Sequence, residues 1–218
     1  AAEAETVAII IKAIEKIGFR DWTLKLGDIG LFSSVLDATG ISPNWKTRLD
    51  DAFLRPLSFR EALKGFAVGV RPPSANFPEE LLSSLRRDDM DASEAAVAVY
   101  LEDQAIELIG TRSLTDITEH LIVIAEERNE APLDARAAEL IERYVGVSGP
   151  ALTAGEKIST LIKEAPSGSG YALETYDRRL ALLANAGIDL GRVSFSAEFG
   201  RTLAYYSGLV FEVNAASL

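Results

Sequence analysis

Residues 199–212 read FGRTLAYYSGLVFE, and this stretch is the most informative part of the chain. Residues 205–213 are rich in aromatic and β-branched side chains, which is typical of a β-strand. In such a strand Tyr206 and Gly208 share one face, and Tyr205 lies on the other. A glycine inside a strand often marks a place where another group approaches the backbone closely. The pattern therefore predicts a strand in which another group lies close to the backbone of Gly208.

Polar side chains in the same stretch could hold a small zwitterion such as an amino acid. Each tyrosine offers a ring for packing and a hydroxyl for hydrogen bonding. Arg201, just before the strand, offers a guanidinium fork for a carboxylate or a phosphate. The alternative is an aromatic core strand preceded by a surface arginine. The residues alone leave both interpretations open.

Two further alternating patterns predict strands near the two ends of the chain. One runs from residue 22 to 26 and the other from 193 to 199. We expect residues 193–213 to form a hairpin or two neighbouring strands. The long region between the two ends is mainly helical in its pattern. We therefore expect an α+β fold that is predominantly helical.

The placement of these strands predicts three segments. Residues 1–40 and 188–218 would form a core with antiparallel sheet strands near both ends. Residues 41–187 would form a mainly helical insertion. The chain does not begin with methionine, so we expect it to be a piece of a longer protein.

Local signals mark where several helices begin and end. Gly40 is expected just after a helix over residues 29–38, and Ser42 followed by Pro43 is expected to open the next helix. Thr153 and Glu156 have the spacing of a capping box. Apolar residues at helical spacing predict further helices near residues 7–17, 43–54, 79–87, 92–109, 114–124, 137–144, 158–162 and 173–183.

Composition excludes several kinds of site. The 218 residues contain no cysteine, which removes disulfides, thiolate zinc sites and cysteine nucleophiles. The single histidine, His120, cannot form a multi-histidine metal site, and no triad is evident around it, so we expect it to be structural. We expect neither a metal nor a cofactor.

The Gly/Ser residues 167–170 lack the Lys-Ser/Thr of a P-loop, so we interpret them as a connector.

Charge and hydropathy limit the partners. The formal net charge of −11 disfavours autonomous nucleic-acid binding, which relies on Lys and Arg. No apolar run is long enough to predict a membrane span, and the first residues do not resemble a signal peptide. Together with the absence of cysteine, this favours the cytoplasm.

The stretch that opens at Arg201 resembles the signature R-G-L-D-Y-Y-T-G-x-x-F-E of histidyl-tRNA synthetases. It equally resembles their paralogues, the regulatory subunits of ATP phosphoribosyltransferase. Ser207 replaces the signature threonine conservatively. The segment Leu26–Phe32 is more similar to the regulatory subunits than to the synthetases. Seven signature positions match: Arg201, Leu203, Tyr205, Tyr206, Gly208, Phe211 and Glu212.

Departures from the signature favour the non-catalytic branch of this family. Thr202 and Ala204 replace its glycine and aspartate, and losing the aspartate removes a charge from the site. The three class II motifs that carry ATP binding are not recognisable in the chain. The resemblance thus implies a fragment of a class II aminoacyl-tRNA synthetase-like fold that is not itself an enzyme.

The resemblance also implies a function and a site. The chain would belong to a regulatory subunit that binds histidine and mediates feedback control of the first step of histidine biosynthesis. It would form a homodimer that joins the catalytic subunit in a hetero-oligomer. The alternatives are a fragment of a histidyl-tRNA synthetase and a purely structural helical domain. Tyr206 would contact the imidazole, Tyr205 would pack or orient, and Arg201 would face a carboxylate or another anion, with Ser207 and Gly208 completing the site.

Overall fold

The computed structural model describes residues 2–55, 58–69, 77–106, 112–167, 171–200 and 208–215. These residues form ten α-helices, one 3₁₀ helix and four short strands, so the predominantly helical α+β class is confirmed. The helices are α1 Ala2–Lys16, α2 Ile29–Thr39, α3 Pro43–Phe53, α4 Phe59–Ala67, α5 Glu79–Ser84, α6 Met90–Asp103, α7 Leu114–Asn129, α8 Ala135–Val145, α9 Ala151–Glu164 and α10 Tyr171–Asn185, with η1 at Leu190–Arg192.

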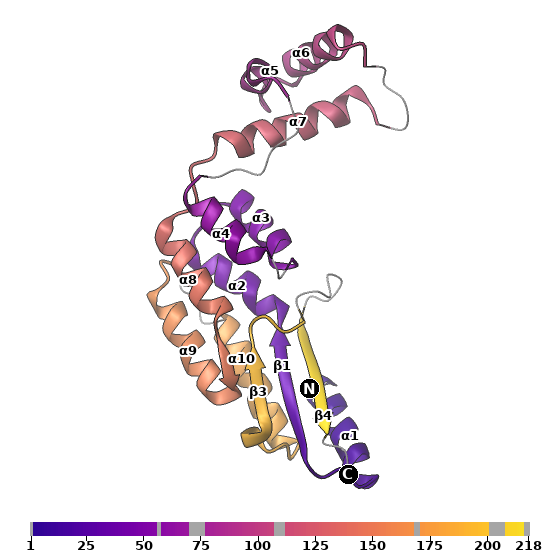
Figure 1. The fold of residues 1–218 in the computed structure, drawn as a ribbon, viewed down its shortest axis with the longest axis vertical. Helices are drawn as coiled ribbons and strands as arrows, with labels where there is room; N and C mark the ends of the chain where they lie inside the picture. The colour runs from indigo at the N-terminus through magenta and orange to yellow at the C-terminus, as the bar shows by residue number, and fades with distance from the viewer. Residues whose placement is uncertain are drawn as a thin grey trace. The chain divides into compact units, whose positions relative to one another are not determined.

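The strands form one mixed sheet in the order β2-β3-β1-β4 (Figure 1). Its members are β1 Trp22–Asp28, β2 Ser148–Pro150, β3 Val193–Ser196 and β4 Leu209–Ala215. Strand β1 pairs in parallel with β3 and antiparallel with β4, and β2 pairs antiparallel with β3. The expectation that residues 193–213 form a hairpin or neighbouring strands is therefore wrong, because β1 lies between β3 and β4.

The described residues divide into two compact units. Unit 1 comprises residues 1–67 and 133–218, and unit 2 comprises residues 68–132. These boundaries differ from the segments expected at residues 1–40, 41–187 and 188–218. The difference has a physical reason, because helices α3, α4, α8, α9 and α10 share a single apolar core with the sheet.

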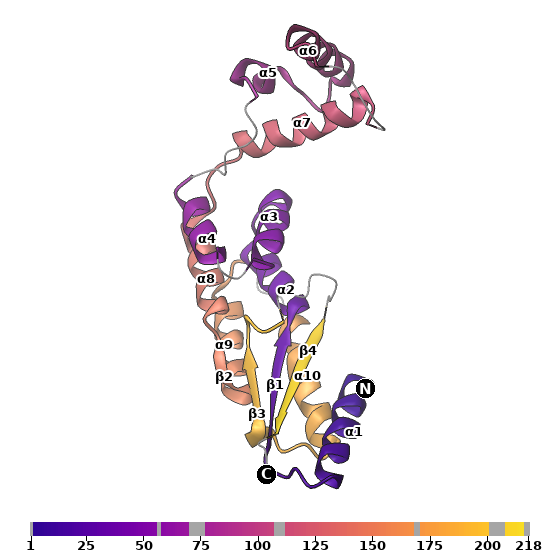
Figure 2. The same cartoon turned by 45° about the vertical axis from the view of Figure 1, so that its right-hand side comes forward.

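The core of unit 1 lies between the sheet and its helices. Helices α1, α10, α9 and α8 contact one another in that order, and α9 also packs on β2 and β3 (Figures 1 and 2). Strand β1 buries Trp22, Leu24 and Leu26, so its alternation is confirmed. Four aromatic rings extend this core, with Phe32 stacked on Phe53 and close to Phe59 and Tyr144.

Unit 2 has its own smaller core. Helices α5, α6 and α7 pack on one another around a cluster of buried apolar side chains. Its seven buried members are Leu81, Leu82, Leu85, Val97, Leu121, Ile122 and Ala125.

Several helix ends agree with the local signals. Gly40 ends α2 in the left-handed conformation with φ +70°, and the Ser42 hydroxyl caps α3, where Pro43 is the first residue. The capping box at Thr153 is wrong. Helix α9 already begins at Ala151, because Pro150 ends β2 in an extended conformation and leaves Thr153 inside the first turn.

Candidate functional site

The predicted ligand-binding residues fall mostly outside the part of the chain that the structure describes. Arg201, Tyr205, Tyr206 and Ser207 lie in the undescribed segment 201–207. Gly208 is described, and it comes directly before β4. The site can therefore be built from Gly208 and from the residues around the two ends of the segment.

Gly208 lies where β1 ends and α2 begins. Its carbonyl oxygen accepts a hydrogen bond from the backbone N–H of Ile29 at 3.2 Å. A Cβ placed on Gly208 would lie 3.9 Å from Nη2 of Arg179, a residue of α10. The guanidinium of Arg179 therefore borders the end of the predicted binding segment.

The other end of the segment is fixed against the same strands by close backbone packing. Gly200 has φ +82°, and a Cβ there would lie 2.2 Å from Cγ2 of Val210. A Cβ on Gly27, in β1, would lie 2.3 Å from the carbonyl oxygen of Phe199. Real Cβ atoms essentially never approach other atoms so closely, so both positions require glycine. Both ends of the segment thus lie close to the last residues of β1.

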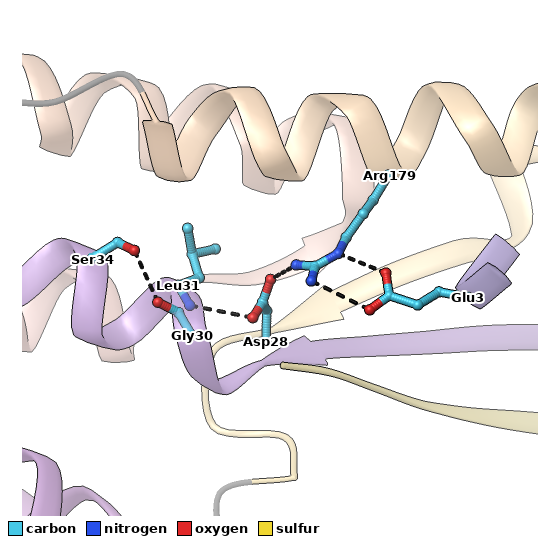
Figure 3. A network of polar contacts seen from close by, with 6 residues as sticks. All are labelled: Glu3, Asp28, Gly30, Leu31, Ser34 and Arg179. Atoms are coloured by element: carbon cyan, nitrogen blue, oxygen red, sulfur yellow. Dashed lines mark hydrogen bonds and ion pairs between the residues drawn. The ribbon is translucent and has the colours of Figure 1, made fainter. Parts of the chain in front are cut away.

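A polar network joins three helices and a strand beside Gly208 (Figure 3). Asp28, the last residue of β1, accepts a hydrogen bond at Oδ1 from the backbone N–H of Leu31 at 3.2 Å and so caps α2. Its Oδ2 pairs with Nη1 of Arg179. Arg179 also donates from Nε to Oε2 of Glu3 at 3.0 Å and from Nη2 to Oε1 at 3.5 Å. In the first turn of α2, the Ser34 hydroxyl donates to the Gly30 carbonyl oxygen at 3.0 Å.

The Glu3–Arg179–Asp28 network has a formal charge of −1, because two carboxylates surround one guanidinium. The side chain of Asp28 is 6% exposed and that of Arg179 is 19% exposed, whereas Glu3 is 48% exposed. Burial lowers the local dielectric and strengthens the interaction of these charges with a neighbouring group. The group of this network that borders Gly208 is the Arg179 guanidinium, which Asp28 and Glu3 hold in place and which could pair with a carboxylate.

Sequence reasoning did not identify Arg179 as a site residue. It noted Asp28 only within the resemblance of residues 26–32. Residues 28 and 179 are 151 positions apart, and no local spacing connects a helical arginine to the end of a distant strand. His120, by contrast, is exposed on α7. In the described ranges, no three His, Cys, Asp or Glu side chains come together in a way that could hold a metal ion.

Comparison with known proteins finds relatives along most of the chain. An ATP phosphoribosyltransferase regulatory subunit from Rhizobium rhizogenes is 31% identical over 194 residues, which cover 88% of this chain and 50% of that protein. Regulatory subunits from Allorhizobium ampelinum and Mesorhizobium japonicum are 31% and 30% identical and cover 89% and 90% of this chain. The chain thus spans about half the length of the curated relatives it matches. No protein-family model matches the chain.

A solved structure shares the fold. It is described as an ATP phosphoribosyltransferase regulatory subunit/histidyl-tRNA synthetase from Bacillus halodurans C. The likeness covers 100% of this chain and 40% of that one, with a TM-score of 0.54 and 16% sequence identity. Together the comparisons confirm the predicted resemblance and the class II synthetase-like fold. In the described residues, no helix is long and apolar enough to cross a membrane.

Proposed function

We propose that this chain is part of a non-catalytic regulatory subunit of ATP phosphoribosyltransferase. The observation that carries the proposal is its identity of 30–31%, along about nine-tenths of its length, to proteins of that name. In this proposal the cytoplasmic subunit forms a homodimer and joins the catalytic subunit in a hetero-oligomer. It binds histidine and mediates feedback control of the first step of histidine biosynthesis.

The proposed histidine site combines the undescribed segment with the described network. Tyr206 contacts the imidazole, Tyr205 packs or orients, and Arg201 faces the ligand carboxylate. Ser207 and Gly208 complete the site. The Arg179 guanidinium beside Gly208, held by Asp28 and Glu3, supports a zwitterionic ligand, because it could pair with the ligand carboxylate.

Calorimetric titration of the full-length protein with L-histidine tests the site. We expect saturable binding that Tyr206→Ala weakens about tenfold or more, equivalent to about 1.4 kcal/mol. Tyr100→Phe, a change to a half-buried tyrosine of unit 2, serves as the control and should leave the affinity unchanged. Absence of binding at millimolar histidine, or binding that Tyr206→Ala does not alter, would contradict the assignment.

The acidic network gives a second test. Asp28→Asn keeps an oxygen that can cap α2 but removes one negative charge beside Gly208. We expect histidine to bind roughly tenfold more weakly to this variant, because the Arg179 guanidinium beside Gly208 loses one of the two carboxylates that hold it. Glu61→Gln, an exposed change of equal charge on α4, should leave the affinity unchanged. Equal affinities for both variants would remove Asp28 from the site.

The regulatory role is tested by combining the full-length protein with the catalytic subunit of ATP phosphoribosyltransferase. The full-length protein should co-purify with the catalytic subunit of ATP phosphoribosyltransferase, and histidine should inhibit the mixture more strongly than the catalytic subunit alone. Light scattering of the free protein tests the homodimer. The alternative function is histidine activation, with the chain as a fragment of a histidyl-tRNA synthetase; the similar solved structure is described by both names. Histidine-dependent exchange of pyrophosphate into ATP would support that alternative instead.

A further inference from the structure

A pocket lies at the opposite end of β1 from Asp28. It has a volume of about 660 Å³ and is bordered by Trp22, the first residue of the strand. The strand has seven residues, so its two ends lie roughly 20 Å apart. The volume lies within the range of small-molecule sites. This pocket is therefore a separate candidate from the proposed histidine site.

Positive charge dominates the lining of this pocket. Four cationic side chains border it, Lys12, Lys16, Arg20 and Arg192, against two carboxylates, which gives a local formal charge of +2. The chain as a whole has a formal net charge of −11, so the concentration of cations is a local feature. Lys12 and Lys16 lie one turn apart on α1, where like charges repel and cost helix stability. A bound anion would relieve that repulsion.

The carboxylates of the pocket are already engaged, whereas most of its cations are not. Oε1 of Glu15 accepts a hydrogen bond from the indole N–H of Trp22 at 2.8 Å. Oδ1 of Asp189 accepts one from the backbone N–H of Gly191 at 2.9 Å. Within the part of the chain that the structure describes, the exposed side chains of Lys12, Lys16 and Arg20 form no ion pair. Their charges are available to a ligand.

Trp22 and Arg192 form a fixed wall of the pocket. The Arg192 guanidinium lies 5.0 Å from the centroid of the Trp22 ring. Its Nη1 also donates to the carbonyl oxygen of Arg20 at 2.8 Å, which holds the guanidinium in place. The indole is 4% exposed and its N–H is occupied, so it offers little to a stacking base. A ligand in this pocket would therefore be bound mainly by the charged lysine and arginine side chains. Their ammonium and guanidinium groups both bind phosphate oxygens well.

We propose that this pocket binds a small phosphate-bearing anion of the diphosphate class, either free pyrophosphate or the phosphate chain of a nucleotide. Lys12 and Lys16 approach the anion from α1, and Arg20 approaches it from the loop before β1. Arg192 completes the site from the end of η1. The proposal is independent of histidine binding, because it uses other residues at the other end of the strand.

The test is a titration of the full-length protein with sodium pyrophosphate in low salt and EDTA. Calorimetry gives the affinity, and tryptophan fluorescence, to which both Trp22 and Trp45 contribute, gives a second binding signal. The test variant is Lys12→Gln/Lys16→Gln/Arg20→Gln. Its control, Lys64→Gln/Lys163→Gln/Arg178→Gln, removes three exposed cations elsewhere in unit 1. Far-UV circular dichroism and the unfolding midpoint confirm that both variants are folded.

We expect the test variant to bind pyrophosphate about tenfold more weakly or worse, and the control to retain wild-type affinity within about twofold. Equal losses in both variants would show general charge attraction and would overturn the site. No binding at millimolar pyrophosphate would also overturn it. ATP in place of pyrophosphate distinguishes the two sources: tighter binding of ATP assigns the pocket to a nucleotide, and equal or weaker binding assigns it to free diphosphate.

Discussion

Tyr144 and Tyr176 are two buried tyrosines in the core of unit 1 whose hydroxyls have opposite environments. The Tyr176 hydroxyl donates to the carbonyl oxygen of Ala151 at 2.7 Å. The Tyr144 hydroxyl is fully buried and has no hydrogen-bond partner among the described residues. Burial raises the pKa of both phenols above their usual range, so both stay neutral in ordinary buffers.

These two tyrosines give opposite expectations for the same substitution. Tyr144→Phe removes a buried polar group that has no partner, so we expect the free energy of unfolding to rise by about 1 kcal/mol. Tyr176→Phe leaves the Ala151 carbonyl without its donor, so we expect a loss of about 1 kcal/mol. Urea unfolding measures both. A Tyr144→Phe protein that is less stable than the wild type would show that the hydroxyl has a partner.

Gly27 is a second residue whose identity the structure explains. A methyl group there would meet the Phe199 carbonyl oxygen at 2.3 Å, and backbone cannot move aside as a flexible side chain can. We expect Gly27→Ala to lower the free energy of unfolding by about 1–3 kcal/mol. Gly146→Ala is the matched control, because φ is −75° there and the nearest atom would be 3.4 Å away. Thermal unfolding should separate the two variants clearly, and similar midpoints would argue against the packing of Phe199 on β1.

At the scale of the element, the capping box of α7 makes stability depend on pH. Oδ2 of Asp116 accepts hydrogen bonds from the backbone N–H of Ser113 at 2.7 Å and from its hydroxyl at 2.8 Å. These bonds lower the pKa of the Asp116 carboxyl below its ordinary value of 3.8. The stabilisation is therefore complete well above pH 3.8 and is lost as the pH falls through the folded-state pKa.

Asp116→Asn should consequently destabilise unit 2 at pH 6 and have a smaller effect at pH 3. Urea unfolding followed by circular dichroism at both pH values measures the difference. Glu119→Gln, an exposed change on the same helix, should show no such difference. A deficit of Asp116→Asn that is the same at both pH values would mean that the carboxylate charge is not what stabilises the cap.

Most helices could be predicted from the sequence because their signals are local. Gly40, Ser42 and Pro43 lie within a few residues of the helix ends that they fix. The order of the strands could not be predicted, because the pairing of β1 with β3 and β4 joins residues far apart in the chain. The three-residue strand β2 was missed for a related reason: its Gly149-Pro150 sequence is more typical of a turn.

The candidate site likewise contains one residue with a local sequence signal, Gly208, and one without such a signal, Arg179. The pattern places Gly208 inside a strand, but β4 begins one residue later, at Leu209, and a Cβ on Gly208 would make only an ordinary contact with the Arg179 guanidinium. Arg179 itself carries no local signal, because an arginine on the polar side of a helix is common. Its role depends on α10 packing beside α1 and the end of β1, which only the folded structure reveals.

At the scale of the whole molecule, unit 2 is an insertion in unit 1, and the chain leaves unit 1 and returns to it at neighbouring residues. The backbone N–H of Leu133 donates to the carbonyl oxygen of Phe66 at 3.0 Å, so the chain returns to the point where it left. Each unit has its own apolar core. Replacing residues 69–131 with a short Gly/Ser linker should therefore leave unit 1 folded, because closing a short loop between adjacent ends costs little entropy.

Amide NMR spectra of the shortened and the complete protein measure this outcome. We expect the resonances of β1, β3 and β4 to keep their chemical shifts, and the unfolding midpoint to stay close to that of the complete chain. A shortened protein with collapsed spectra would show that unit 1 needs unit 2 in order to fold.

The position of β1 in the sheet also determines when the fold can be completed during protein synthesis. Strand β1 precedes both of its neighbours in the sheet, β3 and β4, by about 165 residues or more. Until β3 and β4 have been synthesised, β1 lacks the two strands that flank it in the described structure, and unpaired edges invite association with other chains. Contacts this distant in sequence also slow folding. We therefore expect this part of the sheet to be completed only after the helices of both units have been synthesised, and the exposed edges of β1 to favour aggregation until then.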